Sequence, residues 1–375
     1  MVESTWIRRA GPGIATLGAL ALVAATTLGA TGQTWSPPPC AEPPSAPTPD
    51  GRMRGRAWYR EDPVLRDGAL DSARITLGLA DSSRPRTLAV DAESFAAGPF
   101  GDTVLVGTDD GRQSRLSLID VRRGCAWPIA SSRDVIRRAT VTPDGRTAYE
   151  VRVDRKTRAD LGIWRRPTSG RGAPVMVLDP LGPDPRFGRT FTTAFTWSAD
   201  GGLLAIRSCA EVACRIRVLD PATGRHRLLA DPRFGDVIGL TADRIVAHGA
   251  CRGLPCPIVS VPLGGGDPVV LATTAGLATM TILPDGTARV VMESGPGGRV
   301  LRSVTLDGRS HDDLGPPPNG RRLVPSDGRT ASAVALPPGW IAFGADGRLP
   351  LDGARLARVL DLVGGHTIGL DEVAR

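Results

Sequence analysis

Residues 193–229 read TAFTWSADGGLLAIRSCAEVACRIRVLDPATGRHRLL. This stretch predicts four short strands and two turns, with strands at 193–197, 203–207, 215–220 and 226–229 and turns at 198–201 and 221–224. The alternation Arg215-Ile216-Arg217-Val218 is typical of a strand with one packed and one solvated face. One sheet of this size cannot cover both of its faces, so it needs neighbouring copies.

A turn centred on aspartate recurs along the chain and gives the period of those copies. Asp200, Asp243, Asp285 and Asp327 follow one another at intervals of 42 or 43 residues, and only the step from Asp144 to Asp200 is irregular. The extra residues of that step fit two loops, at 154–160 and 179–189. The expected turn residues are Asp144, Gly145, Asp200, Gly201, Asp243, Asp285, Gly286, Asp327 and Gly328.

This period, with one turn and about four strands per unit, predicts an all-β protein of the β-propeller type. We expect six to seven four-stranded blades and favour seven. The strand order of 193–229 recurs at 139–142, 147–153, 162–165 and 174–178, and again at 279–283, 288–292 and 300–306. Strands from both ends of the chain, at 73–79, 86–90, 330–336 and 340–343, would complete one blade and leave no free edge.

The extent of the blade pattern and the composition of the segments on either side of it set the expected domain boundaries. We expect a signal peptide or signal anchor at 1–35, a proline-rich linker at 36–57, the propeller at 58–350 and a helical extension at 351–375. Within the extension, Leu356, Val359, Leu360 and Val363 have helical spacing. Packing against the domain explains that apolar stripe better than membrane attachment does.

The first 35 residues predict export. Arg8-Arg9 precedes an uncharged run at 10–35 whose apolar centre, 14–28, has the length of a secretory signal. An uncleaved anchor is the equal alternative, and both place the rest outside the cytoplasm. A twin-arginine signal and lipidation of Cys40 fit less well, because Ala10-Gly11-Pro12 follows the arginines and three prolines precede the cysteine. The segment 36–50 favours a stiff polyproline spacer.

Six cysteines in an oxidising compartment indicate disulfides. Cys209 and Cys214, and one period later Cys251 and Cys256, flank short hairpins where cross-strand neighbours come within bonding range. The remaining pair, Cys40 with Cys125, would pin the spacer to the first well-marked blade. A zinc site built from the two Cys-x4-Cys segments is the functional rival.

The composition sets limits on function. The chain has 375 residues, 41% hydrophobic and 23% charged, which fits a globular domain, and its net charge of +7 comes almost wholly from arginine. The Arg pairs at 122–123, 137–138, 165–166 and 321–322 are scattered and not interleaved with aromatics on one element, so we expect no nucleic-acid binding. A high-GC genome explains the arginine content.

No catalytic signature stands out. Asp before Gly caps its own turn and Gly takes the positive φ, so the recurring aspartates have a structural role. The histidines, at 226, 248, 311 and 366, are far apart in sequence, and no serine stands in a Gly-x-Ser-x-Gly elbow. His311-Asp312-Asp313 has side chains that suit a cation, but we expect it in a solvated loop. We expect no catalytic residue, cofactor or metal. Trp127, Trp164, Trp197 and Trp340 are expected in the core or between blades.

The turns at 142–147, 197–201 and 283–286 resemble the Ser-Pro-Asp-Gly turns of WD40-like repeats in the TolB propeller family, and the resemblance covers about residues 95–345. It implies a bacterial, extracytoplasmic and non-catalytic propeller that presents one rim or its central channel to a protein. The sequence after 345 is short for the hydrolase domain of prolyl oligopeptidase-like peptidases, so their activity is not expected.

The leading hypothesis is therefore an exported, non-catalytic TolB-like propeller that binds a protein or a cell-envelope ligand as a monomer. Its only membrane contact would be the N-terminal anchor. A propeller enzyme of lactonase, glycosidase or lyase type, with a site in the central channel, is the alternative from another class. A purely structural envelope protein is the third.

Overall fold

The fold is known from a computed structural model. It describes residues 35–44, 57–66, 69–79, 86–91, 94–100, 102–198, 200–210, 213–229, 237–249, 256–274, 278–282, 287–293, 299–309, 311–313, 333–335, 340–344, 356–361 and 366–369. All regular elements in these ranges are β-strands. A search of the same ranges finds no helix with the length and hydropathy needed to cross a membrane.

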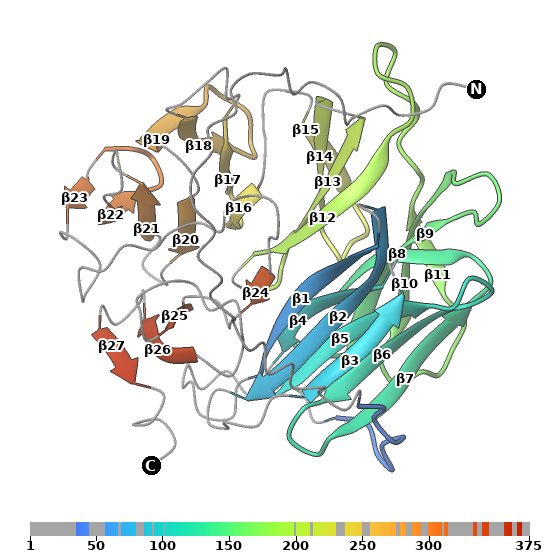
Figure 1. Ribbon diagram of the computed structural model, residues 1–375. Coiled ribbons are helices and arrows are strands. Elements are labelled where there is room, and N and C mark those ends of the chain that lie inside the picture. The colour runs from blue at the N-terminus through green and yellow to red at the C-terminus, as the bar shows by residue number, and fades with distance from the viewer. Residues whose placement is uncertain are drawn as a thin grey trace, which may run out of the picture. The chain divides into compact units, whose positions relative to one another are not determined.

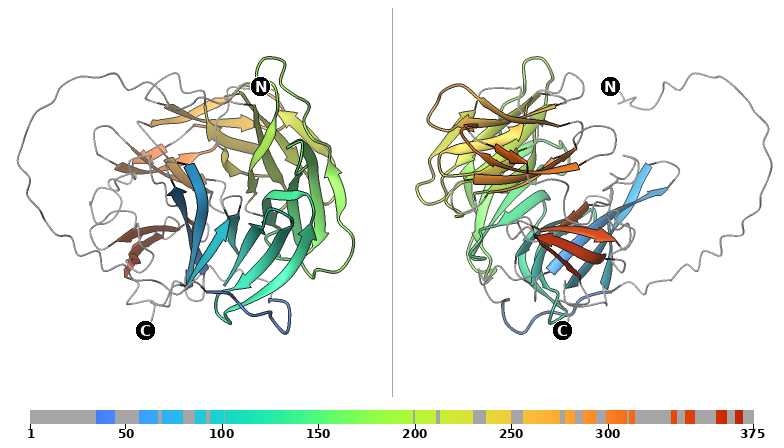
Figure 2. Two further views of the ribbon diagram at one scale, coloured as in Figure 1. Left: turned by 45° about the vertical axis from the view of Figure 1, so that its right-hand side comes forward. Right: turned by 90° about the vertical axis from the view of Figure 1, so that its left-hand side faces the viewer.

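The strands form separate antiparallel sheets, which Figures 1 and 2 show from three directions. The sheet nearest the N-terminus has the order β24-β1-β2-β3, with β24 at Ala333–Ala335, β1 at Ala57–Arg66, β2 at Ala69–Leu79 and β3 at Arg86–Asp91. The second contains β4 (Phe95–Phe100), β5 (Thr103–Asp109), β6 (Ser114–Asp120) and β7 (Cys125–Ser132). The third contains β8 (Val135–Val141), β9 (Thr147–Val153), β10 (Asp160–Pro167) and β11 (Val175–Leu178).

The later sheets repeat this plan. The fourth contains β12 (Phe191–Trp197), β13 (Leu204–Ala210), β14 (Ala213–Leu219) and β15 (His226–Leu229). The fifth contains β16 (Val237–Leu240), β17 (Arg244–His248), β18 (Cys256–Pro262) and β19 (Val269–Thr274). The sixth contains β20 (Ala278–Ile282), β21 (Thr287–Glu293), β22 (Arg299–Thr305) and β23 (His311–Asp313). A three-stranded sheet contains β25 (Trp340–Gly344), β26 (Leu356–Asp361) and β27 (His366–Gly369).

The sheets stack in chain order, and their first strands contact one another. β4 contacts β8, β8 contacts β12, β12 contacts β16 and β16 contacts β20. Each hydrophobic cluster takes residues from two consecutive sheets, because alternate residues of a strand face opposite neighbours. Leu204 and Ile206 pack with Tyr149 of the third sheet, whereas Ala205 packs with Leu240 of the fifth. Four-stranded sheets packed in this way are consistent with a β-propeller.

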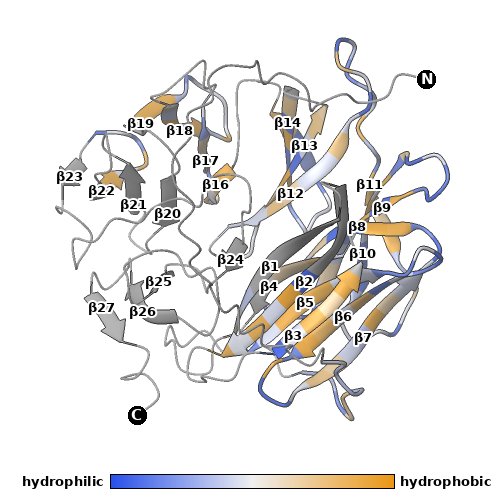
Figure 3. Cartoon of the chain, in the orientation of Figure 1, coloured by the Kyte–Doolittle hydropathy of each residue, from blue (hydrophilic) through white to orange (hydrophobic). Residues whose placement is uncertain are grey.

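Burial between the sheets is the main source of stability. Tyr149, Leu204, Ile206 and Leu240 are each almost completely buried, and burial of such a side chain contributes about 1.5–3 kcal/mol. Figure 3 shows the corresponding distribution, with hydrophobic residues on the strands and hydrophilic residues in the loops around β8–β15.

The expectation that both ends of the chain contribute to one sheet is confirmed. β24, from the last part of the chain, pairs antiparallel with β1, and Tyr59 lies opposite Ala335. β24 thereby covers an edge of β1 that would otherwise expose its backbone groups. The predicted strands at 73–79 and 86–90 correspond to β2 and β3.

Two predictions near the C-terminus were wrong. The segment 353–363 was expected to be helical, but Leu356–Asp361 is the strand β26, which pairs with β25 and β27. Short apolar runs satisfy helical and strand patterns alike, and pairing with two strands decides between them. His311-Asp312-Asp313 was expected in a solvated loop and is the edge strand β23.

Side-chain hydrogen bonds close the described aspartate turns. Thr142 Oγ1 donates to Asp144 Oδ1 at 2.5 Å, and the amide of Arg146 donates to the same oxygen at 3.0 Å. Ser198 and Asp200 repeat this arrangement at 2.6 Å, and Thr241 and Asp243 repeat it at 2.8 Å. Gly145 and Gly201 have φ values of 74° and 72°, which favour glycine. Asp285, Gly286, Asp327 and Gly328 lie outside the described residues.

Candidate functional site

The two ends of each sheet differ in the kind of connection they carry. At one end lie the tight aspartate turns at 142–146, 198–203 and 241–243, which we call the turn rim. At the other lie the connections 110–113, 133–134, 154–159 and 179–190, which we call the insertion rim. The two long loops predicted from the irregular period both lie on the insertion rim. Because long connections on a rigid scaffold are where binding residues concentrate, this rim is the first place to look for a site.

The loops of the insertion rim are held in place by arginines. Arg155 donates to both oxygens of Asp109, with Nη1–Oδ1 at 2.8 Å and Nη2–Oδ2 at 2.6 Å, and its Nε donates to the Arg133 carbonyl at 3.0 Å. Arg189 Nη1 donates to the carbonyl of Thr157 at 2.9 Å and so joins the two long loops. The rim is therefore a preorganised surface, because three of its connections are tied to one another.

The carboxyl group at the base of this rim is strongly acidic. Asp109 also accepts hydrogen bonds from the hydroxyl of Ser114 and, at 2.8 Å, from the amide of Gly111. The hydrogen bonds from Arg155 lower the pKa of Asp109 to about 2. Asp109 therefore stays ionised at neutral pH and serves to fix Arg155.

Three first strands carry a β-bulge close to the insertion rim. In β8 the pairing with β9 skips Arg137, in β12 the pairing with β13 skips Thr193, and in β16 the pairing with β17 skips Ile238. A bulge leaves one residue unpaired and turns its side chain away from the regular alternation. At β8 this places two consecutive arginines, Arg137 and Arg138, on the exposed side of the strand.

Arg137 and Arg138 reach in opposite directions. The guanidinium of Arg137 lies 4.8 Å from the centre of the Phe191 ring on β12, and that of Arg138 lies 5.8 Å from the Phe95 ring on β4. Each contact is a cation–π interaction between neighbouring first strands. Phe95 is fixed in turn by Gly107, which lies opposite it and whose missing side chain leaves space for the ring.

A third arginine, Arg207 on β13, lies beside the bulge of β12. Arg207 Nε donates to the hydroxyl of Thr193, the bulged residue of β12, at 3.0 Å. Burial lowers the pKa of Arg207, because the guanidinium is partly withdrawn from solvent here. Thr193 also contacts Cys209, with 3.7 Å between Oγ1 and Sγ. We call Arg137, Arg138 and Arg207, with Phe95, Phe191 and Thr193, the arginine site.

No acidic residue stands on β4 or β12, the two first strands that flank β8. The first strands β4, β8, β12, β16 and β20 contain no aspartate or glutamate, whereas β8 contributes two exposed arginines. Guanidinium groups bind carboxylates and phosphates through two parallel hydrogen bonds. Flanking aromatic rings add apolar contact, a combination typical of the energetically important centre of a protein interface. The arrangement can bind an anionic ligand.

A second polar cluster lies buried between the second and third sheets. Glu150 is fully buried on β9, and its Oε1 accepts hydrogen bonds from Arg152 at 2.6 Å and Arg166 at 3.0 Å. Arg152 in turn lies over the ring of Trp164 at 4.5 Å. One carboxylate is shared by two guanidinium groups, and these contacts hold the side chains in place within the interface, so we assign this cluster a structural role.

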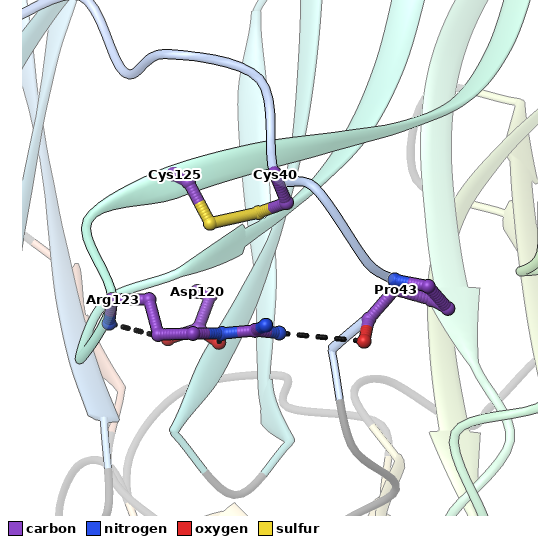
Figure 4. The surroundings of a disulfide bond; sticks show 5 residues. All are labelled: Cys40, Pro43, Asp120, Arg123 and Cys125. Atoms are coloured by element: carbon purple, nitrogen blue, oxygen red, sulfur yellow. Dashed lines mark hydrogen bonds and ion pairs between the residues drawn. A yellow bond between two sulfur atoms is a disulfide. The ribbon is translucent and has the colours of Figure 1, made fainter.

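Two of the three predicted disulfides are present. Cys209 and Cys214 lie directly opposite each other in the β13–β14 pair, with Cα atoms 4.0 Å apart. Cys40 and Cys125 are bonded with Cα atoms 5.0 Å apart (Figure 4). Cys251 lies outside the described residues, so its bond to Cys256 stays a prediction. Disulfides point to a location outside the cytoplasm.

Of the tryptophans expected in the core or between blades, Trp127 and Trp197 are half-buried and contact a neighbouring sheet. Trp197 donates from Nε1 to Thr140 at 3.0 Å and meets the edge of Tyr149, and Trp127 donates to the Thr168 carbonyl of the next sheet at 3.0 Å.

The arginine site was not predicted from the sequence. In the sequence, Arg137-Arg138 is one of several scattered arginine pairs without a predicted binding role. The run from Val135 to Ala139 does break the alternation of a regular strand, and this irregularity is the signal that indicates a bulge. Within the described residues, no three His, Cys, Asp or Glu side chains are grouped as metal ligands would be.

Comparison with known proteins supports the fold. No protein-family profile and no curated protein matches the sequence. Among solved structures, TolB from Acinetobacter baumannii is similar, with 15% identity, a TM-score of 0.40, and coverage of 70% of this chain and 64% of that chain. A prolyl endopeptidase has 13% identity and a TM-score of 0.54 over 84% of this chain and 49% of its own. An oligogalacturonate lyase in complex with manganese has 11% identity and a TM-score of 0.48 over 84% and 85%.

The chain thus spans less than two thirds of the length of the first two of these proteins. At such low identity the likeness concerns the fold alone. The prolyl endopeptidase, whose TM-score exceeds 0.5, supports a propeller fold, and the similar proteins include both TolB and propeller enzymes.

Proposed function

We propose that the protein is an exported, non-catalytic binding module whose arginine site takes an acidic segment of a protein partner in the cell envelope. One observation carries this proposal. Arg137 and Arg138 are exposed on a bulged first strand, each beside an aromatic ring, and none of the five first strands carries a carboxylate. A ligand with several carboxylates would pair with both guanidinium groups.

The site is suited to a protein ligand because its parts are fixed before binding. Arg137 and Arg138 lie against Phe191 and Phe95, and Arg207 is held by Thr193. Less side-chain entropy is therefore lost when a partner binds than with freely rotating arginines. The surrounding loops of the insertion rim are tied together, which provides a defined surface for the rest of the partner.

A titration with an acidic peptide tests the proposal. The probe is a fluorescein-labelled peptide of alternating Asp, Glu and Ala, and the readout is fluorescence anisotropy. We expect the double variant Arg137→Glu/Arg138→Glu to bind at least about 10-fold more weakly than the wild type, since two charge contacts are reversed. Arg171→Glu, a change at an exposed arginine between β10 and β11, is the matched control and should bind within about twofold of the wild type. Equal affinities of the double variant and the control would contradict the proposal.

The alternative of a propeller enzyme with a channel site stays a prediction. It requires a site that loses activity or stability when calcium is removed, so thermal unfolding with and without EDTA tests it. An unchanged midpoint would count against a calcium-dependent enzyme and would leave the peptide titration unaffected.

A further inference from the structure

One face of β14 carries arginines and is nevertheless covered. The alternation at 215–218 predicted one packed and one solvated face. Ile216 and Val218 do pack on the fifth sheet, but Arg217, on the opposite face, has only 4% of its surface exposed. Leu219 shares that face and packs on the third sheet. The prediction of a solvated face was therefore wrong at Arg217, because neighbouring sheets cover both faces of β14.

Arg217 and Arg215 fasten the 179–190 connection over this face. Nη1 of Arg217 donates to the Asp179 carbonyl at 2.5 Å. Nη2 of Arg215 donates to the Gly182 carbonyl at 2.9 Å. Both acceptors are neutral backbone oxygens, so these bonds fix the connection but supply no negative charge.

One edge of the Arg217 guanidinium lacks an acceptor. Its Nε and Nη2 are buried, and no described residue accepts a hydrogen bond from either of them. The N–H groups of these two nitrogens point in parallel from the same side of the planar guanidinium, which is how arginine binds an anion through two hydrogen bonds. Buried charges are usually paired, because an unpaired charge is costly to remove from water. This edge therefore has both the geometry and the need for a negative partner.

A comparison with Arg166 shows why this edge of Arg217 is unusual. Nε of Arg166 is also buried without an acceptor, but Nη2 of the same side chain binds the carboxylate of Glu150 at 3.0 Å. The charge of Arg166 is thus compensated inside the protein. Among the described residues, no carboxylate is hydrogen-bonded to Arg217 in this way.

The carboxylates around Arg217 act on it only from a distance. Burial lowers the pKa of Arg217, and of the surrounding charges Asp160 and Asp179 act against this shift while Arg215 adds to it. Asp179 is exposed, so solvent screens its charge. The oxygens of Asp160 accept hydrogen bonds from an amide and a hydroxyl of other residues. Neither carboxylate takes the place of a bonded counter-ion.

The enclosure of this edge limits the size of a ligand. Nε and Nη2 of Arg217 are out of contact with solvent. Thr192 and Ser208 lie on the same face of the fourth sheet, and each is only 1% exposed. A peptide or a nucleotide therefore cannot reach the guanidinium while the 179–190 connection is in place, whereas a small ion can be enclosed there.

We propose that Nε and Nη2 of Arg217 hold a small monovalent anion of the size of chloride, between the third and fourth sheets and under the 179–190 connection. The anion completes the hydrogen bonds of the guanidinium, because Nη1 already binds the Asp179 carbonyl. It compensates the buried charge where the connection begins, and it thereby stabilises this part of the insertion rim. The proposal goes beyond the binding of a protein partner and shares no residue with the arginine site.

Hydrogen–deuterium exchange in chloride and in gluconate tests the proposal. Sodium gluconate replaces sodium chloride at a constant ionic strength of about 150 mM, because gluconate is too large for an enclosed site. We expect peptides that cover 179–190 to exchange several-fold more slowly in chloride, since a ligand that binds the folded state opposes opening. The turns at 142–146 and 198–203, on the turn rim, are internal controls and should exchange equally in both salts.

Three variants locate the effect at Arg217. Arg217→Met keeps an unbranched side chain and removes every N–H group, so chloride should no longer slow exchange at 179–190. Arg217→Gln removes the charge but keeps a donor for the Asp179 carbonyl, and it should also lose the chloride effect, so the test stands if Arg217→Met does not fold. Arg227→Met, at an exposed arginine of β15 in the same sheet, is the matched control and should keep the full effect.

Exchange at 179–190 that is the same in chloride and in gluconate would overturn the proposal, and so would a chloride effect that persists in Arg217→Met or Arg217→Gln. Equal slowing of the turn rim would show a general salt effect and would overturn it too. A failed peptide titration would leave these results untouched, because neither the acidic peptide nor the arginine site takes part in them.

Discussion

Arg155 and Asp109 join the second and third sheets through two parallel hydrogen bonds, 2.8 and 2.6 Å long, between one guanidinium and one carboxylate. The carboxylate is almost inaccessible to solvent, with 6% of its side chain exposed, and the guanidinium is 25% exposed. This pair fixes the 154–159 loop against the end of β5, so it decides the shape of the insertion rim.

Asp109→Asn should destabilise the protein by about 1–2 kcal/mol, because it removes the charge of the carboxylate that accepts two hydrogen bonds from the partly buried guanidinium of Arg155. Urea unfolding measures the change. Asp110→Asn is the matched control, since Asp110 lies in the same turn, is exposed, and accepts its backbone hydrogen bonds through an oxygen that asparagine retains. The control should unfold like the wild type, and an equal loss in both variants would contradict this role of the pair.

Stability should fall in acid through the same carboxyl. The pKa of Asp109 is about 2 in the folded protein and has an ordinary value of 3.8, so its contribution is complete above about pH 4 and is lost as the pH falls toward 2. Hydrogen bonds from Ser198 and Gly202 lower the pKa of Asp200 in the same direction. Urea unfolding between pH 6 and pH 2 should show a smaller acid loss in Asp109→Asn than in the wild type. Parallel curves would show that Asp109 does not carry the shift.

Gly124→Ala should weaken the attachment of residues 35–44 to the outer strands of the first two sheets. Gly124 has a φ of 69°, and an added β-carbon would lie 1.7 Å from Nη1 of Arg86, which would have to leave the Trp35 ring. Gly111→Ala is the matched control, because Gly111 has a φ of 79° and no atom near the added carbon. Both variants have the backbone cost of about 1 kcal/mol. Thermal unfolding should show about 0.5–1 kcal/mol more for Gly124→Ala, the value of the lost cation–π contact. Equal losses would show that the contact contributes nothing.

Non-reducing peptide mapping of the exported protein should recover the links 40–125, 209–214 and 251–256. The first two are present in the structure, and the third repeats the spacing of the second one period later. A free thiol at position 251 or 256 would show that this hairpin does not repeat the register of β13 and β14. Free thiols at positions 209, 214, 251 and 256 together with bound zinc would support the rival site built from both Cys-x4-Cys segments.

Much of the fold could be predicted because local sequence decides it. The Thr142–Asp144 and Ser198–Asp200 turns contain within a few residues every group that they need, so their position and period could be read directly. The strands between them follow from alternation. The pairing of β24 with β1 was expected on a more general ground, since an uncovered edge is unfavourable.

What the sequence could not supply depends on contacts between distant residues. Leu356–Asp361 has an apolar pattern that suits a helix, and only its pairing with β25 makes it a strand. The exposure of Arg137 depends on a bulge, which is a property of the β8–β9 register and not of either strand alone. The position of Arg207 beside the same site depends on the packing of the fourth sheet on the third.

Hydrogen–deuterium exchange with the acidic peptide bound tests the central claim most directly. The account predicts slower exchange in peptides covering 135–141 and 191–197, which carry Arg137, Arg138 and Phe191, and unchanged exchange in the turns at 142–146 and 198–203. Protection of those turns, or protection that persists in Arg137→Glu/Arg138→Glu, would contradict it.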